Sequence, residues 1–481
     1  MRRPAARKNT TMNFTVADIL EATAGRLLAG PADAPAGTVS TDTRRPAAGQ
    51  TFLALAGGAF DGHDFLAEAV ARGAACLIVH RADAVPAAAA KRGTAVVLVA
   101  DTLRALGDLG RAARGRLACP VVAVTGSCGK TTVKEMLGHI LSRHVRGRVP
   151  PASFNNLVGV PLTLLAAEPD DQFVLCEFGT NAPGEIARLA DIARPTIGIV
   201  TLVAATHLEG LGSLDGVAEE KAALVDAIPS DGVAVLNADD PRVARMAERC
   251  RGRVVTVGTT WEADLQAGHV VQTDRALCFT TSGSAGFAVP VLGAHQAVLA
   301  LAATAAAREL GIPVEASAEA LRDFRPPPMR LALAEAGGVV VLNDSYNANP
   351  ASMTAALALL ALWPDRRKVF VCGDMLELGA ASRPAHEALG REAAEAKVAR
   401  LVCVGPESRA TAEAARQAGL DADQVTTVGD AVAAADLAVR MVEPGDVVLV
   451  KGSRAVALER VAEMIVASRG ASVSRGAQHS A

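Results

Sequence analysis

The sequence predicts an α/β protein of three units with mostly parallel sheets. Short apolar runs rich in valine, isoleucine and leucine alternate with segments of helical spacing along almost the whole chain. Consecutive runs are separated by enough chain for a helical crossover, which favours parallel pairing. The length of 481 residues also corresponds to about three domains.

Composition and charge limit the possible classes of function. Half of the residues are hydrophobic but only 3% are aromatic, so we expect cores of alanine, valine and leucine. The net charge of −3, without a basic stripe, argues against a nucleic-acid partner. No apolar stretch of membrane-spanning length runs without a charge or a breaker, and the basic start precedes no apolar signal segment. Eight cysteines without a CxxC pair fit a reducing cytoplasm.

The first unit is expected over residues 12–114. Residues 16–28 have helical spacing, and two apolar runs before residue 100 predict strands. Polar stretches with glycines, Ser40–Arg44 and Gly57–Phe65, permit tight loops. Such loops suit a small polar ligand, although the spacing alone is more typical of ordinary surface hairpins.

The second unit, expected over residues 115–327, begins with a pattern typical of a phosphate-binding loop. A β-branched apolar run leads into Thr125-Gly-Ser-Cys-Gly-Lys-Thr-Thr132, and apolar residues then recur at helical spacing. Glycines let backbone N–H groups approach phosphate oxygens, and a helix N-terminus favours anions. Lys130 would reach the β/γ-phosphates and the Thr131 hydroxyl would contact Mg²⁺. The strict motif has a glycine where this chain has Val124, so an ordinary strand–turn–helix remains the alternative.

Polar residues also follow the other predicted strands of the second unit. In parallel sheets, ligands bind at the carboxyl ends of the strands, so Glu177 and Asn237 are expected near a nucleotide. Glu177 is a candidate Mg²⁺ ligand, but a helix cap or a solvated strand end explains it equally well. His207 and Lys221 carry no comparable signal, because a lone histidine is more often structural and a helical lysine more often solvated.

A proline-rich stretch, Phe324–Arg330, predicts an extended connector to a third unit at residues 328–470. Alternating strands and helices predict a second doubly wound domain there. Its predicted strands again end in polar residues, within Asp344–Asn349, Gly373–Glu377 and Lys451–Arg454. Two such domains joined by a hinge predict a cleft that closes on substrates.

Taken together, the motifs resemble those of the Mur ligases of peptidoglycan synthesis. The resembling stretches are, in order, Thr125–Thr132, Glu177, Ala205–Glu209, Lys221, Gly293–His295, Asp344–Pro350 and Lys451–Arg454. Four further stretches resemble the family member that adds D-alanyl-D-alanine to UDP-N-acetylmuramoyl-tripeptide: Thr41–Arg44 with Phe60–Phe65, Asn155–Thr163, Asp344–Met353 and Gly373–Gly379. The Asp-Asn-Pro-Arg motif usual in the sister enzyme that adds the third amino acid is absent from the sequence.

The resemblance implies both a fold and a reaction. It implies a small α/β UDP-binding domain, a central ATPase domain with a mostly parallel sheet, and a Rossmann-like C-terminal domain. The reaction is amide ligation: the tripeptide carboxylate attacks the γ-phosphate of ATP to form an acyl phosphate and ADP. The amine of D-Ala-D-Ala then attacks the acyl carbon and phosphate leaves. Such catalysis consists largely of positioning and charge neutralisation.

The resemblance also implies the roles of individual residues. The loop residues that would hold ATP are Thr125, Gly126, Ser127, Cys128, Gly129, Lys130, Thr131 and Thr132, joined by Asn237, His295, Arg330 and Asp344. Two Mg²⁺ ions would be held by Thr131, Glu177, His207 and a carbamylated Lys221, in which CO₂ turns the amine into a carboxylate-like group. Lys130, Glu177, His207 and Lys221 would form the catalytic set. Substrate contacts would come from Ser40, Thr43 and Arg44 (UDP), Asn155, Asn156 and Thr163 (muramoyl-peptide), and Tyr346, Asn347 and Asn349 (D-Ala-D-Ala or the peptide end).

Two positions depart from the family pattern, and other interpretations stay open. Cys128 stands where Asn or Ser is more common; we expect little loss of binding but sensitivity of this thiol to alkylation. Gln296 stands where Asn usually follows the histidine, which leaves one adenine contact open. The alternatives are another ligase of the superfamily, such as the third-residue enzyme or folylpolyglutamate synthetase, and a non-catalytic nucleotide-binding partner. A simple phosphate-loop ATPase is disfavoured because it would not need the first unit. A cytoplasmic monomer acting on small molecules is expected.

Overall fold

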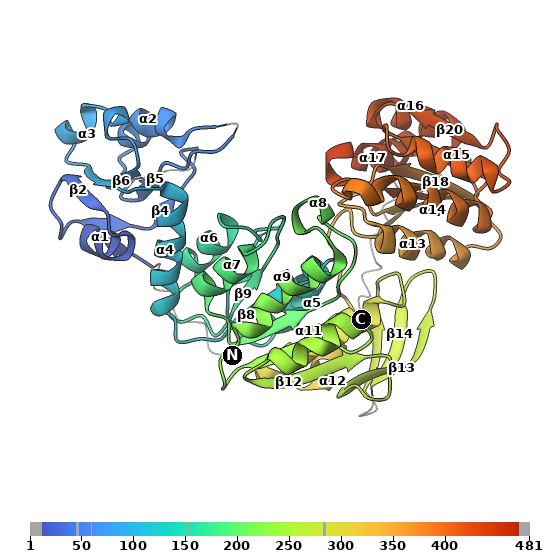
Figure 1. Cartoon of the computed structure of the whole chain (residues 1–481), viewed down its shortest axis with the longest axis horizontal. Helices are drawn as coiled ribbons and strands as arrows, with labels where there is room; N and C mark the ends of the chain where they lie inside the picture. The colour runs from blue at the N-terminus through green and yellow to red at the C-terminus, as the bar shows by residue number, and fades with distance from the viewer. Residues whose placement is uncertain (1–11, 45–47, 59, 152, 282–284, 471–481) are drawn as a thin grey trace, which may run out of the picture.

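The computed structural model describes residues 12–44, 48–58, 60–151, 153–281 and 285–470. In Figure 1 the N-terminal unit (blue) and the C-terminal unit (orange to red) lie on opposite sides of a central unit (green to yellow). Each unit is built on its own β-sheet with helices packed against it, which confirms the predicted α/β class. Within these described ranges, no helix is both long and apolar enough to cross a membrane.

The N-terminal unit contains a five-stranded sheet in the order β2-β7-β6-β5-β4. Its strands are β2 (Arg26–Ala29), β4 (Val39–Ser40), β5 (Thr51–Leu53), β6 (Cys76–Val79) and β7 (Ala95–Leu98), with a small ribbon of β1 (Phe14–Thr15) and β3 (Pro35–Gly37) beside it. Its helices are α1 (Val16–Thr23), α2 (Leu66–Ala71) and α3 (Ala88–Lys91). The helix α4 (Thr102–Gly115) leads from this unit to the central one (Figure 1).

The predicted helix over residues 16–28 is wrong in its second half. Helix α1 ends at Thr23, and Ala24 takes a left-handed backbone with φ 51°. Residues 26–29 instead form β2, which pairs antiparallel with β7. Gly25 permits this close approach, because a Cβ there would lie 2.6 Å from Val97 Cγ1. The helical spacing of the apolar residues was overridden by pairing with a strand about seventy residues away.

The central sheet has eight strands in the order β15-β14-β13-β12-β11-β10-β8-β9. They are β8 (Val121–Thr125), β9 (Val174–Glu177), β10 (Ile197–Val200), β11 (Val233–Asn237), β12 (Arg253–Gly258), β13 (Leu265–Gln272), β14 (Leu277–Thr281) and β15 (Gly286–Val289). The predicted parallel pairing is confirmed from β9 through β12. The antiparallel hairpins of β13, β14 and β15 were not predicted; their alternating burial leaves no continuous apolar run.

Helices cover both faces of the central sheet. They are α5 (Lys130–Leu141), α6 (Gly159–Leu165), α7 (Glu185–Ala193), α8 (Leu208–Leu211), α9 (Leu214–Asp226), α10 (Pro241–Arg245), α11 (Gln296–Glu309) and α12 (Val314–Leu321). Val122 and Val124 of β8 pack with α5 and α11, whereas Val121 and Ala123 pack with α4, α6 and α7. A strand buried on both faces must be apolar throughout, which is why β8 was recognisable in the sequence.

The C-terminal unit is doubly wound, as predicted. Its six strands run in the order β16-β17-β21-β18-β19-β20, and all pair in parallel except β16. They are β16 (Ala332–Ala336), β17 (Val339–Asn343), β18 (Arg367–Gly373), β19 (Arg400–Val404), β20 (Val425–Val428) and β21 (Asp446–Lys451). Its helices are α13 (Pro350–Ala358), α14 (Ser382–Glu395), α15 (Arg409–Gln417), α16 (Ala431–Met441) and α17 (Glu459–Ser468).

Candidate nucleotide and metal site

The loop between β8 and α5 has the backbone of a phosphate cradle. Gly126 and Gly129 adopt positive φ angles of 144° and 83°. A Cβ at Gly126 would lie 1.8 Å from Thr201 Oγ1, so only glycine fits there. The loop is held against the end of β10, because Ser127 N donates to Leu202 O at 2.8 Å and the Thr201 hydroxyl donates to Cys128 O. The geometry therefore presents backbone N–H groups at the start of a twelve-residue helix.

Lys130, the first residue of α5, is folded over this cradle. Its ammonium donates to Gly126 O at 2.6 Å. Burial lowers the pKa of Lys130, and the carboxylate of Glu177 opposes this effect. A partly buried cation beside the backbone N–H groups of a helix start is suited to an anionic group such as a triphosphate.

Thr131 and Glu177 form a buried pair of side chains next to the loop, and their oxygen atoms could bind a metal ion. The Thr131 hydroxyl lies 2.9 and 3.0 Å from the two carboxylate oxygens of Glu177, which is only 1% exposed. Asn155 Nδ2 donates to the same carboxylate at 3.1 Å. Hydroxyl and carboxylate oxygens are the ligands that Mg²⁺ prefers, so Thr131 and Glu177 fit a magnesium site.

Lys134 is a member of this cluster that the sequence analysis did not identify. Its side chain is fully buried, and its Nζ lies 4.0 Å from a Glu177 oxygen and 2.8 Å from Glu135 Oε1. It also donates to Pro150 O at 3.3 Å. The signal that could have found it is its position, because a residue four after Lys130 lies on the same helix face. The contact places a second cation behind the candidate metal ligand.

His207 and Lys221 lie close enough to Lys130 for its charge to lower the pKa of both. His207 directly precedes α8, and its Nδ1 contacts the Glu377 carboxylate. Burial lowers the pKa of His207 and the charges of Lys130 and Lys221 lower it further, against the raising effect of Glu377. Lys221 on α9 is 2% exposed, and burial, followed by the charge of Lys130, lowers its pKa to about 7. The helical lysine that spacing alone assigned to solvent is therefore buried beside the phosphate loop.

The lowered pKa of Lys221 predicts a pH-dependent gain in stability for Lys221→Met. Folded and unfolded pKa values near 7 and 10.5 mean that the unfolded chain binds more protons between these pH values. The wild-type stability contribution from this residue therefore rises with pH across that window. In CO₂-free buffer, we expect the variant to be more stable than wild type by a few kcal/mol at pH 7. This advantage should shrink towards pH 10.5 in urea unfolding, whereas an equal difference at both pH values would contradict the burial effect.

Residues of the hinge and the C-terminal unit reach the phosphate loop. Arg330 Nη2 donates to Thr131 Oγ1 at 2.8 Å, and its guanidinium lies 4.0 Å above the centre of the Tyr346 ring. The Tyr346 hydroxyl donates to Ser153 Oγ at 2.6 Å. Asn349, which caps α13, donates through Nδ2 to Cys128 Sγ at 2.8 Å. Residues far apart in sequence thus meet at one loop.

The remaining predicted nucleotide residues lie around this cluster. Asn237 ends β11 and donates to Thr201 O at 2.8 Å. His295 precedes α11, and Gly293 leaves room for its ring. Gln296 Oε1 is buried and has no hydrogen-bond partner among the residues that the structure describes. Such an orphaned acceptor fits a ligand donor such as the amino group of adenine. Asp344 accepts from Lys451 Nζ at 2.6 Å.

Several predicted substrate residues are engaged in local contacts instead. The Ser40 hydroxyl and Asp42 form a turn, Arg44 pairs with Asp42, and the Thr43 hydroxyl lies 3.4 Å from Glu68 Oε2. Asn156 Oδ1 accepts from Gly159 N at 2.9 Å, and Thr163 Oγ1 donates to Gly159 O at 2.8 Å. Asn347 O accepts from Lys451 Nζ at 2.9 Å. Their roles toward substrate stay predictions, and so do those of the other site residues.

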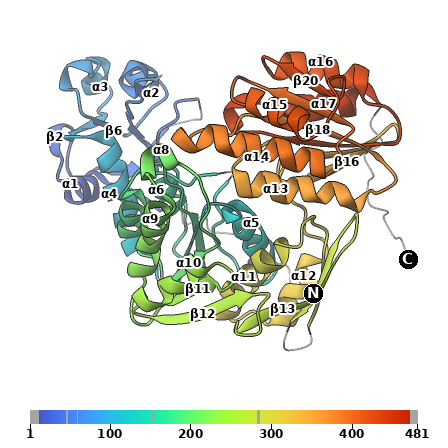
Figure 2. The same cartoon turned by 45° about the vertical axis from the view of Figure 1, so that its right-hand side comes forward.

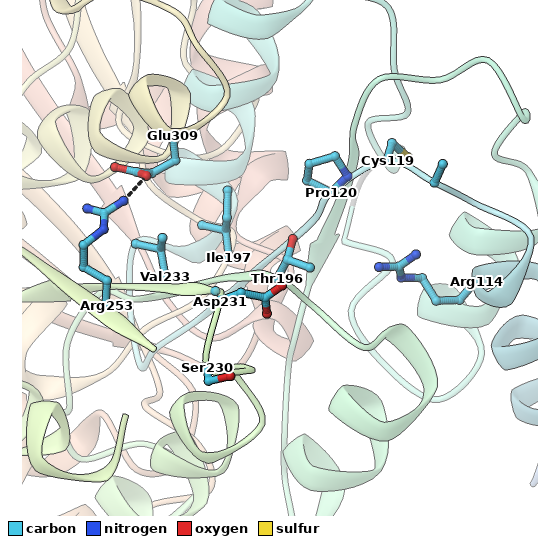
Figure 3. Close-up of a pocket in the computed structure, with 12 residues that line it drawn as sticks. Arg114, Cys119, Pro120, Thr196, Ile197, Ser230, Asp231, Val233, Arg253 and Glu309 are labelled. Carbon is cyan, nitrogen blue, oxygen red and sulfur yellow. Dashed lines mark hydrogen bonds and ion pairs between the residues drawn. The ribbon is translucent and has the colours of Figure 1, made fainter. Parts of the chain in front are cut away.

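A separate pocket of about 530 Å³, drawn in Figure 3, lies at the amino ends of the inner strands of the central sheet. It is lined by residues that precede or begin strands, among them Pro120, Thr196, Val233 and Arg253, which forms an ion pair with Glu309. The phosphate loop instead follows the carboxyl end of β8. Because ligands of parallel sheets bind at the carboxyl ends, we do not assign this pocket to the nucleotide.

Fold and site together define a nucleotide-binding α/β enzyme whose phosphate loop is contacted by a second doubly wound unit. Family models match in three places: the Mur ligase family catalytic domain at residues 37–114, the Mur ligase middle domain at 124–307, and the Mur ligase glutamate ligase domain at 329–454. The chain belongs to the Mur ligase family.

Individual relatives cover nearly the whole chain. A UDP-N-acetylmuramoyl-tripeptide–D-alanyl-D-alanine ligase of Mycobacterium bovis is 38% identical and covers 95% of this chain and 98% of its own. MurF from Acinetobacter baumannii has a similar structure, with a TM-score of 0.86, 30% identity, and coverage of 95% of this chain and all of that one. A MurF ligase from Thermotoga maritima, solved with ADP, has a TM-score of 0.78 at 27% identity and covers 90% of this chain and 97% of that one.

Proposed function

We propose that this protein is an ATP-dependent ligase that joins D-alanyl-D-alanine to UDP-N-acetylmuramoyl-tripeptide during peptidoglycan precursor synthesis. The observation that carries the proposal is the buried Thr131–Glu177 pair beneath the phosphate loop, contacted by Arg330 from the hinge. A simple ATPase has no need for a contact between its loop and another unit. The names of the relatives supply the substrates, and the Thermotoga protein was solved with ADP.

The residues would divide the work of phosphoryl and acyl transfer. Lys130 and the loop N–H groups would bind the β/γ-phosphates, and Thr131 and Glu177 would hold Mg²⁺, which neutralises phosphate charge when bound. His207 would help to hold a second Mg²⁺. Arg330, which donates a hydrogen bond to Thr131 Oγ1, would contact the phosphates from the hinge side. The peptide carboxylate would take the γ-phosphoryl group as an acyl phosphate, and the D-Ala-D-Ala amine would displace phosphate from it.

Carbamylation of Lys221 is part of this proposal. CO₂ reacts with the neutral amine, and a pKa of about 7 leaves much of the Lys221 amine neutral in the physiological range. The product carries a negative charge, which would lie beside Lys130 and reverse the repulsion between the two lysines. A carboxylate-like group there would complete the oxygen ligands of the second Mg²⁺.

A substrate-dependent phosphate-release assay tests the function. We expect phosphate release with ATP, Mg²⁺, UDP-MurNAc-tripeptide and D-Ala-D-Ala together. We expect no turnover when either UDP-MurNAc-tripeptide or D-Ala-D-Ala is omitted. A single amino acid in place of the dipeptide serves as the control for a third-residue or glutamate ligase. Turnover with the single amino acid but not with the dipeptide would reject the proposed substrate. No turnover in the full mixture would favour a non-catalytic nucleotide-binding protein.

The proposal includes the organisation of the chain. Domains at 12–114, 115–327 and 328–470 would bind UDP, ATP and the incoming dipeptide, respectively, and the ligase would act as a cytoplasmic monomer. The separate sheets of the three units support this division. Light scattering on the purified protein would measure the oligomeric state directly.

A further inference from the structure

Glu377 and His207 connect the C-terminal and central units beside the nucleotide site. The Glu377 carboxylate contacts His207 Nδ1, and Glu377 O accepts from Glu209 N at 3.4 Å. The His207 side chain is 23% exposed and that of Glu377 is 53% exposed. Figure 2 shows α8, which begins just after His207, close to the start of α14, which follows Glu377 by a few residues. The contact is thus a partly buried bridge between two units.

Both residues hold an unusual backbone conformation where they meet. His207 has φ 54° and Glu377 has φ 63°, in the left-handed region that non-glycine residues seldom occupy. Each such residue costs on the order of 1 kcal/mol and persists where surrounding contacts hold it. Gly379, at φ 55°, lies against Glu209 and completes the junction. Both loops are therefore shaped to bring the two side chains together.

Stability alone gives little reason for this arrangement. An ion pair or hydrogen bond with one partner half exposed contributes between about 0 and 1 kcal/mol, which is no more than the backbone conformations cost. The contact instead determines which nitrogen of the His207 ring carries the proton. A carboxylate at Nδ1 accepts a hydrogen bond from the Nδ1–H group, so in the neutral ring the lone pair is left on Nε2. Metal-binding histidines are commonly held in this way by a carboxylate on the other nitrogen.

We propose that Glu377 is a positioning residue for His207: it sets the Nδ1–H tautomer and leaves the Nε2 lone pair free to bind a metal ion when the C-terminal unit packs against the central one. This inference rests on the proposed role of His207 in holding Mg²⁺. Because the two residues belong to different units, the histidine takes its metal-binding form only when these units are together. Domain closure and binding of the second metal are thereby coupled. Phosphoryl transfer before the C-terminal unit arrives would be disfavoured.

The first test reads the tautomer of His207 in metal-free, full-length protein labelled with ¹⁵N-histidine. The His207 signals are assigned by their loss in His207→Gln. In wild type we expect the Nδ1–H form, and in Glu377→Ala a shift to the Nε2–H form that free histidine prefers. Glu377→Gln, whose amide oxygen still accepts a hydrogen bond, should retain most of the Nδ1–H form. Glu209→Gln is the matched control, because it removes a nearby charge without touching the imidazole.

The second test measures Mn²⁺ binding by electron paramagnetic resonance in the presence of a non-hydrolysable ATP analogue. Loss of an outer carboxylate of this kind lowers metal affinity about 10- to 100-fold, so Glu377→Ala should weaken the second Mn²⁺ by that factor. Glu209→Gln should bind like wild type. An unchanged His207 tautomer together with unchanged Mn²⁺ affinity in Glu377→Ala would overturn the proposal. If Glu377→Ala shows both changes relative to wild type, but the wild-type protein catalyses no ligation, the proposed function is rejected and the positioning role of Glu377 stands.

Discussion

Lys130→Ala is expected to lower kcat/KM for ATP by about 10³-fold or more in the substrate-dependent phosphate-release assay. Its ammonium lies within the cradle, 2.6 Å from Gly126 O, where it would meet the triphosphate. The loop backbone would remain, since Gly126 and Thr201 hold it independently of this side chain. The loss should therefore fall on phosphate binding and transfer, and not on the fold.

Two controls sharpen this expectation. Lys91→Ala removes an exposed lysine from α3 and should leave turnover unchanged. Circular dichroism of Lys130→Ala should match wild type. The melting temperature should match or slightly exceed it, because the variant lacks a partly desolvated cation. Turnover of Lys130→Ala within tenfold of wild type would show that the loop does not bind the transferred phosphate.

Lys221→Ala is expected to lose most turnover, on the order of 10²-fold or more, and to recover part of it when short carboxylic acids such as acetate are added. The wild-type side chain is 2% exposed, so its truncation leaves a buried space beside Lys130. A small carboxylate can occupy that space and supply the negative charge that we propose for a carbamate on Lys221. Titration of the rate with acetate, at constant ionic strength, provides the measurement.

The same acids supply the control for this experiment. They should not restore Lys130→Ala, because that variant lacks a cation and not an anion. Chloride at equal concentration should not restore Lys221→Ala. Full activity of Lys221→Ala without any added acid would refute the carbamate, while leaving the proposed ligation itself intact. Incorporation of ¹³C-bicarbonate into wild type, followed by ¹³C NMR, would show the modification directly.

Local features of the site were predictable because they depend on neighbouring residues. A buried strand, two glycines and a helix start lie within a dozen residues, and this order alone places Lys130 and Thr131 at a phosphate loop. The sequence left Glu177 as either a Mg²⁺ ligand or a helix cap or solvated strand end. The parallel register of β8 and β9 pairs it with Val124 and so places it next to the phosphate loop. The helix expected to continue to residue 28 failed for the converse reason, since β7 competes for residues 26–29.

Long-range features were not predictable from spacing. The burial of Lys221 depends on the packing of α9, and the buried side chain of Lys134 donates a hydrogen bond to Pro150 O, sixteen residues away. The bridge from Glu377 to His207 spans 170 residues and two units. Neither residue shows by its neighbours in sequence that it has a partner across the hinge.

The sequence by itself determined the α/β class, the phosphate loop and, through its motifs taken together, the family. These features follow from apolar periodicity, glycine placement and helix starts, which act over a few residues. Only the tertiary structure decided which charged and polar side chains share one site: Lys130 with Glu177, Arg330 with Thr131, and Glu377 with His207. The physical reason is that burial and distance set the energies of charges, and both depend on how separate units pack.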